Sequence, residues 1–372
     1  MKVIVVGGGV IGCSAAWELA KAGCAVTLFE RSTPGAEASG AAAGLLAPLG
    51  ETAGTPFERL AVASWRLYPE VAEELRERTG IDVEYVTRGT IYPVLDAEDL
   101  DAVRARAQRP ESRELGIEAW DVADVRDREP ALAVRVRGAM FVKGDHWVNN
   151  QRLVVAYAQA ALAAGVLMRP GTVVSRILVE DGHARGVVAD GERYGADAVV
   201  LAAGAWSGEL TETLGERLPI EPRRGQMIAL THVPAVIRHA VHAANVYLVP
   251  RPSGELLIGA TVERVGFKRE VTADGIAGLL AAAIALAPAL GSLSISRTWY
   301  GFRPWATDGQ PVLGPWPGIE GLIVATAHFR NGILLAPITA RLVCEWIMGG
   351  RPSVATEPFR PDRFLRKTRS TA

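Results

Sequence analysis

The chain has 372 residues, of which 49% are hydrophobic and 22% charged, and its formal net charge is −1. This length predicts about two or three domains, and the balanced charge does not favour nucleic acid or a membrane surface as a partner. No apolar run reaches the ~20 residues that a membrane helix needs, and three consecutive glycines interrupt the apolar N-terminus before it could act as a signal peptide. We therefore expect a cytoplasmic protein.

Neither the cysteines nor the histidines form a pattern typical of a disulfide or a metal site. Cys13, Cys24 and Cys344 are widely separated, and the six histidines are scattered along the chain. We expect free thiols in a reducing compartment and no structural or catalytic metal.

The first thirty residues predict a strand, a glycine-rich turn, a helix and a second strand. The apolar run 3–6 leads into three glycines, the stretch 13–22 is amphipathic, and a second apolar run, 25–29, follows the turn at Gly23. This order is typical of a βαβ unit that binds a dinucleotide.

The glycines of this turn have separate roles. Gly7 permits a tight turn, Gly9 lets the backbone approach a pyrophosphate, and Gly12 allows the helix to pack closely on the strand. The N–H groups at the helix N-terminus would then meet the phosphates. Glu30, 18 residues after Gly12, can accept hydrogen bonds from ribose hydroxyls and would repel a 2′-phosphate, which disfavours NADP. The fingerprint leaves NAD and FAD open.

A loop of small residues and a helix come next. Residues 34–44 are mainly glycine, alanine and serine, and such side chains let a flat ring lie against backbone. Apolar residues near a 3.6 period predict a helix over 57–79 that Gly80 ends.

The middle of the chain changes character after residue 81. Short strand candidates at 83–87 and 90–94 precede a charged helix around 97–108. A helix from about 151 to 164 leads to strand candidates at 173–179 and 184–190.

A second strand and glycine turn follows at 197–207. A buried strand, small residues, a glycine and a helix start stand in the same order as at the N-terminus. Such a turn can bring a second strand end, with Ala203, Gly204 and Trp206, to the cofactor.

The rest of the chain predicts short strands and a return to the first domain. Strand candidates between 219 and 302, interrupted by an alanine-rich helix at 274–286, resemble an antiparallel sheet with a covering helix. A last strand at 322–325 precedes the segment 328–337 and a helix to about 348.

These elements predict an α/β fold with a Rossmann-like nucleotide-binding domain and an inserted α+β substrate domain built on an antiparallel sheet. We expect residues 1–82, 146–215 and 303–372 to form the nucleotide-binding domain. Residues 83–145 and 216–302 should form the substrate-binding domain.

Several motifs resemble those of the FAD-dependent amine and amino-acid oxidases of the D-amino-acid oxidase and sarcosine oxidase family, and within it the glycine oxidases of the thiamine-biosynthesis type. The resemblance covers nearly the whole chain. Its most specific pieces are Gly301-Phe302-Arg303-Pro304 and the segment 328–337, joined by Asp308-Gly309-Gln310-Pro311. The glycine fingerprint, the stretch 39–48 and the segment 246–251 also match.

The resemblance implies non-covalent FAD as the cofactor, because no cysteine lies near Arg303 or His328 in the sequence. The segment from His328 to Leu334 would wrap the pyrimidine end of the flavin, where helix N–H groups could stabilise negative charge. Val173 would contact the adenine side. The residues that fall where the family contacts FAD are Gly7, Gly9, Val10, Ile11, Gly12, Glu30, Arg31, Ala38, Ser39, Ala43, Gly44, Leu45, Val173, Ala203, Gly204, Trp206, His328, Phe329, Arg330, Asn331, Gly332, Ile333 and Leu334.

The resemblance also implies a substrate site. Arg303 matches the arginine that holds the substrate carboxylate, and its rigid fork of donors suits two carboxylate oxygens. Tyr247 matches the tyrosine that assists it, and Arg330 lies where the family places a main-chain group near the amine. Position 45 is Leu where relatives often carry Met, and Asn245 can alter the polar rim beside Tyr247.

The activity implied is oxidation of glycine or another small amino acid, such as sarcosine or a D-amino acid, by hydride transfer to FAD with O₂ as acceptor. A homotetramer or homodimer and a role in thiamine biosynthesis are implied by relatives alone. The alternatives are an FAD-dependent dehydrogenase that uses a non-oxygen acceptor, an NAD-dependent enzyme, and a non-enzymatic nucleotide-binding component.

Overall fold

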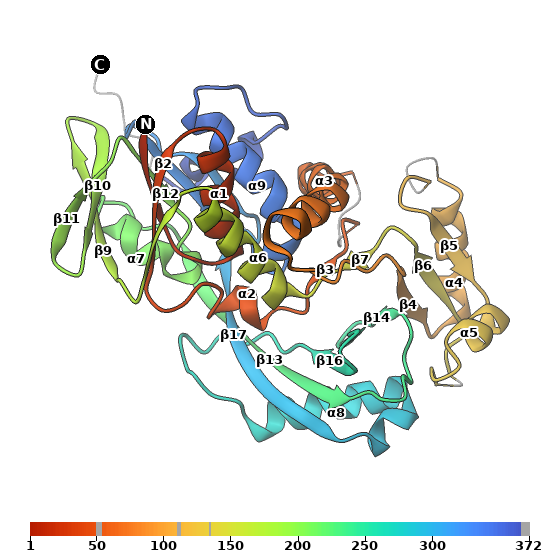
Figure 1. Cartoon of the computed structure of the whole chain (residues 1–372). Helices are drawn as coiled ribbons and strands as arrows, with labels where there is room; N and C mark the ends of the chain where they lie inside the picture. Colours follow the sequence, from red (N-terminus) through yellow and green to blue (C-terminus); the bar gives the residue numbers. More distant parts are fainter. Residues whose placement is uncertain (50–53, 110–112, 134, 366–372) are drawn as a thin grey trace.

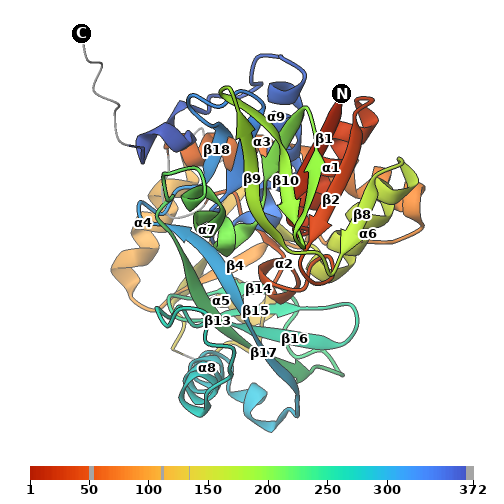
Figure 2. The ribbon, with the colours of Figure 1, turned by 90° about the vertical axis from the view of Figure 1, so that its left-hand side faces the viewer.

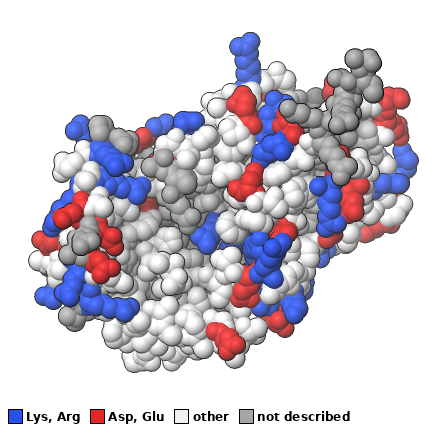
Figure 3. All heavy atoms as spheres, turned by 180° about the vertical axis from the view of Figure 1, so that it is seen from behind, with Lys and Arg blue, Asp and Glu red and all other residues white. Residues whose placement is uncertain are grey.

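The computed structural model describes residues 1–49, 54–109, 113–133 and 135–365 (Figure 1). Two large sheets dominate it. In Figure 1 the six-stranded sheet is at the upper left, and the eight-stranded sheet runs from β17 and β13 in the lower part to β6 and β5 on the right. No helix in the described ranges is long and apolar enough to cross a membrane. Seen from behind, positive and negative side chains intermingle over the visible face (Figure 3).

The six-stranded sheet has the order β18-β19-β12-β1-β2-β8 and is parallel except for β18. In β1, Val3 and Val5 belong to one buried cluster while Ile4 and Val6 belong to another, because successive side chains of a strand point to opposite faces. Both faces of the sheet are therefore covered. Its strands are β1 (Lys2–Val6), β2 (Ala25–Glu30), β8 (Leu167–Pro170), β12 (Ala198–Leu201), β18 (Val312–Pro315) and β19 (Leu322–Thr326).

A layer of four helices covers one face of this sheet, with α3 packed on α6 and α9, and a small antiparallel sheet covers the other face, with α7 (Ser207–Glu212) beside it. Figure 2 shows the small sheet in front of the parallel strands. The helices are α1 (Val10–Lys21), α3 (Pro56–Thr79), α6 (Asn150–Ala163) and α9 (Gly332–Ile347). The small sheet contains β9 (Val174–Glu180), β10 (His183–Ala189) and β11 (Glu192–Gly195).

The eight-stranded sheet has the order β17-β13-β16-β15-β14-β4-β6-β5, and only β14 and β4 pair in parallel. Helix α8 (Ala273–Leu286) packs on one face, and α4 (Ala97–Ala107) and α5 (Val122–Arg128) lie by β5 and β6. The strands are β4 (Thr90–Val94), β5 (Ile117–Trp120), β6 (Gly138–Val142), β13 (Ile220–Thr231), β14 (Ala240–His242), β15 (Tyr247–Pro250), β16 (Glu255–Gly259) and β17 (Ile295–Ala306).

Short elements lie between the two sheets. Helix α2 (Ala38–Ala41) contacts β17, and β3 (Leu45–Leu46) pairs with β7 (His146–Trp147). The strand predicted at 83–87 is wrong, since only Val86 forms a bridge, with Trp147. The positive φ of 53° at Glu84 breaks the extended conformation there.

Helix α9 carries Pro337 in its interior, and α3 compensates for it. A proline has no N–H for the carbonyl four residues earlier, here that of Ile333. Tyr68 of α3 donates its hydroxyl to this carbonyl, and Ser64 donates to the next one, that of Leu334, at 2.6 Å. The first turn of α9 therefore depends on two side chains of α3.

We expect Tyr68→Phe to lower the free energy of unfolding by about 1–3 kcal/mol, because the buried Ile333 carbonyl would lose its donor. A urea titration of the FAD-loaded protein measures the change. Tyr194→Phe is the control, since its hydroxyl bonds Glu192 at the surface and its loss should cost less than about 0.5 kcal/mol. Equal stability of Tyr68→Phe and the unchanged protein would contradict this role for Tyr68.

Candidate active site

A cavity of about 1130 Å³ runs from the carboxyl end of β1 to the face of the eight-stranded sheet opposite α8. This volume exceeds that of most small-ligand pockets. The cavity can therefore hold a dinucleotide and a small second molecule together.

The glycine turn after β1 forms one end of the cavity. Gly7 has φ +108°, and a Cβ there would lie 2.4 Å from the Ala202 carbonyl oxygen. Gly9 begins α1 without a side-chain cap, and the Ser39 hydroxyl accepts the N–H of Val10 at 3.0 Å. A Cβ on Gly12 would lie 1.8 Å from the Gly7 oxygen. The turn is therefore closely packed where Gly7 meets Ala202 and where Gly12 meets Gly7, and its other side faces the cavity.

Glu30 lies at the end of β2 and is only 8% exposed. Its two carboxylate oxygens accept the N–H groups of Gly8 at 2.7 Å and Ser32 at 2.8 Å. Each oxygen keeps further acceptor capacity toward the cavity. This is the geometry needed to receive ribose hydroxyls.

The small-residue loop is packed tightly between the two sheets. Gly44 has φ +74°, and a Cβ there would lie 2.0 Å from the Val148 carbonyl oxygen. The buried Arg251 donates to the carbonyls of Val148 and Ala43 and to Asn150 Oδ1, the last two at 2.9 Å. Burial lowers the pKa of Arg251 to about 10, so it stays charged. These bonds fix the wall beside the cavity.

A row of residues crosses the eight-stranded sheet at the other end of the cavity. Strand register aligns Met227, Gly259, Tyr247 and His242 on four neighbouring strands, and the Tyr92 ring lies 5.4 Å from that of His242. All five line the cavity. A Cβ on Gly259 would lie 2.5 Å from the Tyr247 hydroxyl, so the glycine makes room for it. Sequence patterns did not identify Tyr92 or His242 because strand register is a tertiary property.

Arg303 enters this end of the cavity from β17. Its side chain crosses Gly225, where a Cβ would lie 2.1 Å from Nη1, and Nη1 donates to the Thr261 carbonyl at 3.0 Å. Burial lowers the pKa of Arg303, while the neighbouring Tyr247 hydroxyl and the charge of Glu263 act in the opposite direction. Burial raises the pKa of Tyr247 and Arg303 opposes it. Arg303 therefore supplies a fixed cation to the cavity, and Tyr247 supplies a neutral hydroxyl.

The segment before α9 is tied to β17 next to Arg303. The Phe329 N–H donates to the Pro304 carbonyl at 3.0 Å, and His328 forms a bridge with Trp305. His328 Nε2 lies 3.1 Å from the Thr339 hydroxyl, and burial lowers its pKa to about 3, so the ring is neutral. Asn331 does not cap α9 with its side chain. The first N–H groups of α9 are thus available to negative charge in the cavity.

The structure brings most of the predicted site residues together. Gly12 and Leu334 are absent from the described lining, because Gly12 packs under the glycine turn and Leu334 is buried in α9. The predicted residues that line the cavity are Gly7, Gly9, Val10, Ile11, Glu30, Arg31, Ala38, Ser39, Ala43, Gly44, Leu45, Val173, Ala203, Gly204, Trp206, Tyr247, Arg303, His328, Phe329, Arg330, Asn331, Gly332 and Ile333.

Within the described ranges, no group of three or more His, Cys, Asp or Glu side chains could hold a metal ion. Cys13 is buried below the glycine turn, where its thiol donates to the Gly8 carbonyl, and burial raises its pKa to about 12. Cys24 and Cys344, like Cys13, are outside the described lining of the cavity.

Comparison with known proteins agrees with this geometry. The model of the family described as FAD dependent oxidoreductase matches residues 2–346. The chain is 37% identical over 369 residues to the glycine oxidase of Pseudomonas putida, with 98% of this chain and 99% of that protein covered. It is 39% identical to the bifunctional protein ThiO/ThiG of Synechocystis, over 98% of this chain and 54% of that protein.

The crystal structure of glycine oxidase from Geobacillus kaustophilus matches the fold with a TM-score of 0.92 at 35% identity, covering 98% of both chains. These findings confirm the predicted fold class and the prediction of FAD as the cofactor.

We expect Glu30→Gln to weaken FAD binding about tenfold, because an amide replaces the charged acceptor of the ribose hydroxyls. Quenching of flavin fluorescence on reconstitution of the apoprotein measures Kd. Glu212→Gln, which disturbs only a surface ion pair with Arg217, is the control. An unchanged Kd for Glu30→Gln would remove Glu30 from the cofactor site.

Proposed function

The chain belongs to the FAD-dependent oxidoreductase family, and we propose that it is an oxidase of glycine and other small amino acids, sarcosine and D-amino acids among them. The products would be a 2-oxo acid, ammonia or an amine, and H₂O₂. The observation that carries this proposal is the position of Arg303, a half-buried cation that shares a cavity with Tyr247 and with the N-terminus of α9.

The residues of the cavity fit FAD. The start of α1, where Gly9 supplies no side-chain cap and only the Val10 N–H is bonded to Ser39, suits the pyrophosphate. Glu30 suits the adenosine ribose, and Val173 and Arg31 line the cavity farther along. Arg31 also stacks on Trp206 at 4.2 Å. We propose that FAD is held without a covalent bond, which the positions of the cysteines support. Once bound, FAD supplies the acceptor of a hydride from the substrate α-carbon.

We propose that Arg303 holds the substrate carboxylate and that Tyr247 supports it. A guanidinium can donate to both carboxylate oxygens, which fixes the direction of the α-carbon as well as the charge. The Tyr247 hydroxyl can donate to the same carboxylate. The contribution of these residues is positioning and electrostatics.

We propose that the backbone of Arg330, rather than its side chain, contacts the substrate amine. Arg330 lines the cavity, and its side chain is exposed and lies over the Phe329 ring at 5.3 Å, which supports a main-chain contact with the amine rather than a side-chain one. A backbone carbonyl there can accept an N–H of the amine. Neither Tyr247, whose pKa is raised, nor His328, whose weakly basic ring faces Thr339, is suited to remove the α-proton. This supports hydride transfer from a substrate with a neutral amine.

Apolar side chains border the substrate end and do not set a sharp size limit. Leu45, Met227 and Val262 line the cavity. An apolar wall discriminates between two substrates that differ by one methylene by only about 1–3 kcal/mol. We therefore propose a preference for small amino acids rather than strict selection of glycine.

We further propose a role in thiamine biosynthesis, which the similarity to a bifunctional protein ThiO/ThiG supports. The proposed place of action is the cytoplasm, and the proposed assembly is a homotetramer or homodimer. Size-exclusion chromatography with light scattering tests the assembly, and a monomer would contradict it.

A panel of amino acids assayed for H₂O₂ under air tests the proposed activity. Glycine, sarcosine, D-alanine and D-proline should produce peroxide with oxygen consumption. Reduction of a dye without peroxide would instead identify a dehydrogenase with another acceptor. A protein that takes up FAD but leaves all four compounds unchanged would overturn the proposal.

We expect Arg303→Ala to raise the KM for glycine at least about 30-fold, since breaking a buried charge pair costs on the order of 2–5 kcal/mol. FAD content should stay unchanged. Arg297→Ala on the same strand, which loses the ion pair with Glu255 and the contact with the Trp299 ring, is the control. Unchanged glycine kinetics in Arg303→Ala would remove this residue from the site.

A further inference from the structure

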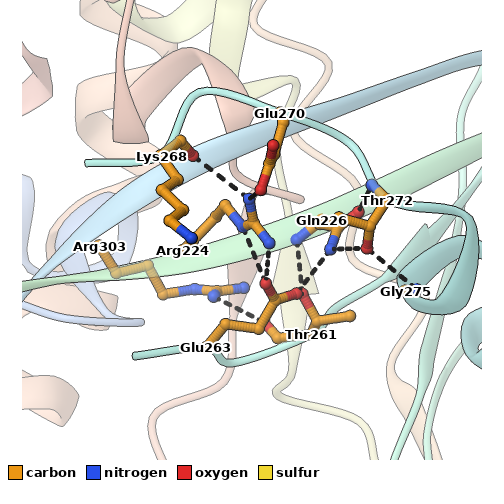
Figure 4. Close-up of polar contacts among 9 residues, drawn as sticks. All are labelled: Arg224, Gln226, Thr261, Glu263, Lys268, Glu270, Thr272, Gly275 and Arg303. Atoms are coloured by element: carbon orange, nitrogen blue, oxygen red, sulfur yellow. Dashed lines mark hydrogen bonds and ion pairs between the residues drawn. The ribbon is translucent and has the colours of Figure 1, made fainter. Parts of the chain in front are cut away.

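The segment that follows β16 carries part of the cavity wall and the carbonyl that Arg303 contacts. Thr261 and Val262 of this segment line the cavity, and the segment continues alongside β13 to the start of α8. Figure 4 shows that its polar side chains meet those of β13 in one cluster next to Arg303. The cluster lies outside the residues that the family motifs identify.

Thr261 is fixed to Gln226 of β13 through its backbone and its side chain. The Thr261 N–H donates to the Gln226 carbonyl at 3.3 Å, and the Gln226 N–H donates to the Thr261 hydroxyl oxygen at 2.8 Å. The hydroxyl in turn donates to Glu263 Oε1 at 2.5 Å. Three bonds therefore determine where the Thr261 carbonyl points.

Glu263 is the centre of the cluster (Figure 4). Oε1 also accepts from Gln226 Nε2 at 2.7 Å, and Oε2 accepts from Arg224 Nε at 2.8 Å and from its Nη2. Gln226 is fully buried and Arg224 is 3% exposed. Burial alone would raise the pKa of Glu263, but the hydrogen bonds from Thr261, Gln226 and Arg224 outweigh it and hold the pKa below its ordinary value. The carboxylate is therefore an anion.

We propose that Glu263 is a positioning residue for Arg303: it fixes the Thr261 carbonyl that orients the guanidinium, and its charge stabilises this cation between substrate turnovers. The Thr261 carbonyl accepts a hydrogen bond from Arg303. Because Gly225 has no Cβ, the Arg303 side chain can pass over it to reach this carbonyl. Arg330 opposes the charge on Arg303 and Glu263 favours it. The inference rests on the proposed role of Arg303 as the carboxylate-binding residue.

The first test is Glu263→Gln, which keeps the shape and removes the charge. We expect the KM for glycine to rise about tenfold while kcat changes less than about twofold, because binding is lost through a misplaced Arg303. FAD content should match that of the unchanged protein, whereas Tm should fall, because the buried Arg224 then keeps only Glu270 as a charged partner. Glu255→Gln is the matched control: this carboxylate also pairs with an arginine, Arg297 of β17, and is similarly exposed, 28% against 22%. Equal KM values for the two variants would overturn the proposal.

A second variant separates positioning from general weakening of the fold. Thr261→Val removes the hydroxyl and leaves the pair between Glu263 and Arg224 in place. It should raise the KM for glycine in the same direction, by a smaller factor than Glu263→Gln. If Thr261→Val left KM unchanged while Glu263→Gln raised it, the route through the Thr261 carbonyl would be wrong.

A double variant tests whether Glu263 acts through Arg303. In an Arg303→Lys background, Glu263→Gln should change the KM for glycine less than about twofold, because residues in one network are not additive. Two independent factors that multiply would overturn the proposal.

A binding measurement keeps this inference distinct from the proposed activity. Acetate, a carboxylate without an amine, can be titrated into the FAD-loaded protein and followed by the flavin absorbance spectrum. Glu263→Gln should weaken acetate binding by the same factor as it raises KM. If the unchanged protein bound acetate but did not oxidise glycine, the proposed activity would fail while the inference stood. Equal acetate affinity in both proteins would overturn the inference.

Discussion

The pairing of β17 with the segment before α9 is the constraint on which the site depends. β17 belongs to the eight-stranded sheet and α9 packs on the six-stranded sheet, and the bonds from Phe329 to Pro304 and between His328 and Trp305 join them. Arg303 is one residue before this junction, so backbone bonds fix its position relative to the start of α9. The positive φ values of Ala327 and Phe329 show that the segment is held in a conformation that L residues rarely adopt. Such strain, about 1–3 kcal/mol each, persists only where the surroundings determine the backbone.

The sequence predicted the features that local chemistry determines. The glycine turn, the acid at the end of β2 and the alternation of strands and helices follow from residue types at fixed spacing, and they were sufficient for the fold class. The strand predicted at 83–87 failed because the chain crosses between the two sheets there and only Val86 pairs. The parallel pairing of β14 with β4, which joins two distant segments in one sheet, could not be derived from either segment alone.

The site residues also fall into two groups, those that the sequence identified and those that only the structure shows. Arg303 and Tyr247 stand in motifs that the family resemblance identified, whereas Tyr92 and His242 reach the cavity only through strand register. Arg224 and Glu263 are 39 residues apart and give no local signal. Arg224 is buried because the segment after β16 lies against β13 and covers it. The carboxylate of Glu263 in that segment pairs with the Arg224 guanidinium.

The charges explain why the cluster and the substrate site belong together. A guanidinium taken out of water is costly unless it has partners of opposite charge or good acceptors. Without substrate, Arg303 has the Thr261 carbonyl, the Tyr247 hydroxyl and the field of Glu263, which are enough to hold it charged but do not neutralise it fully. In the proposed role of Arg303, a substrate carboxylate would complete this set. The site would then be organised before binding, and the remaining interaction would be the one that a small amino acid brings with it.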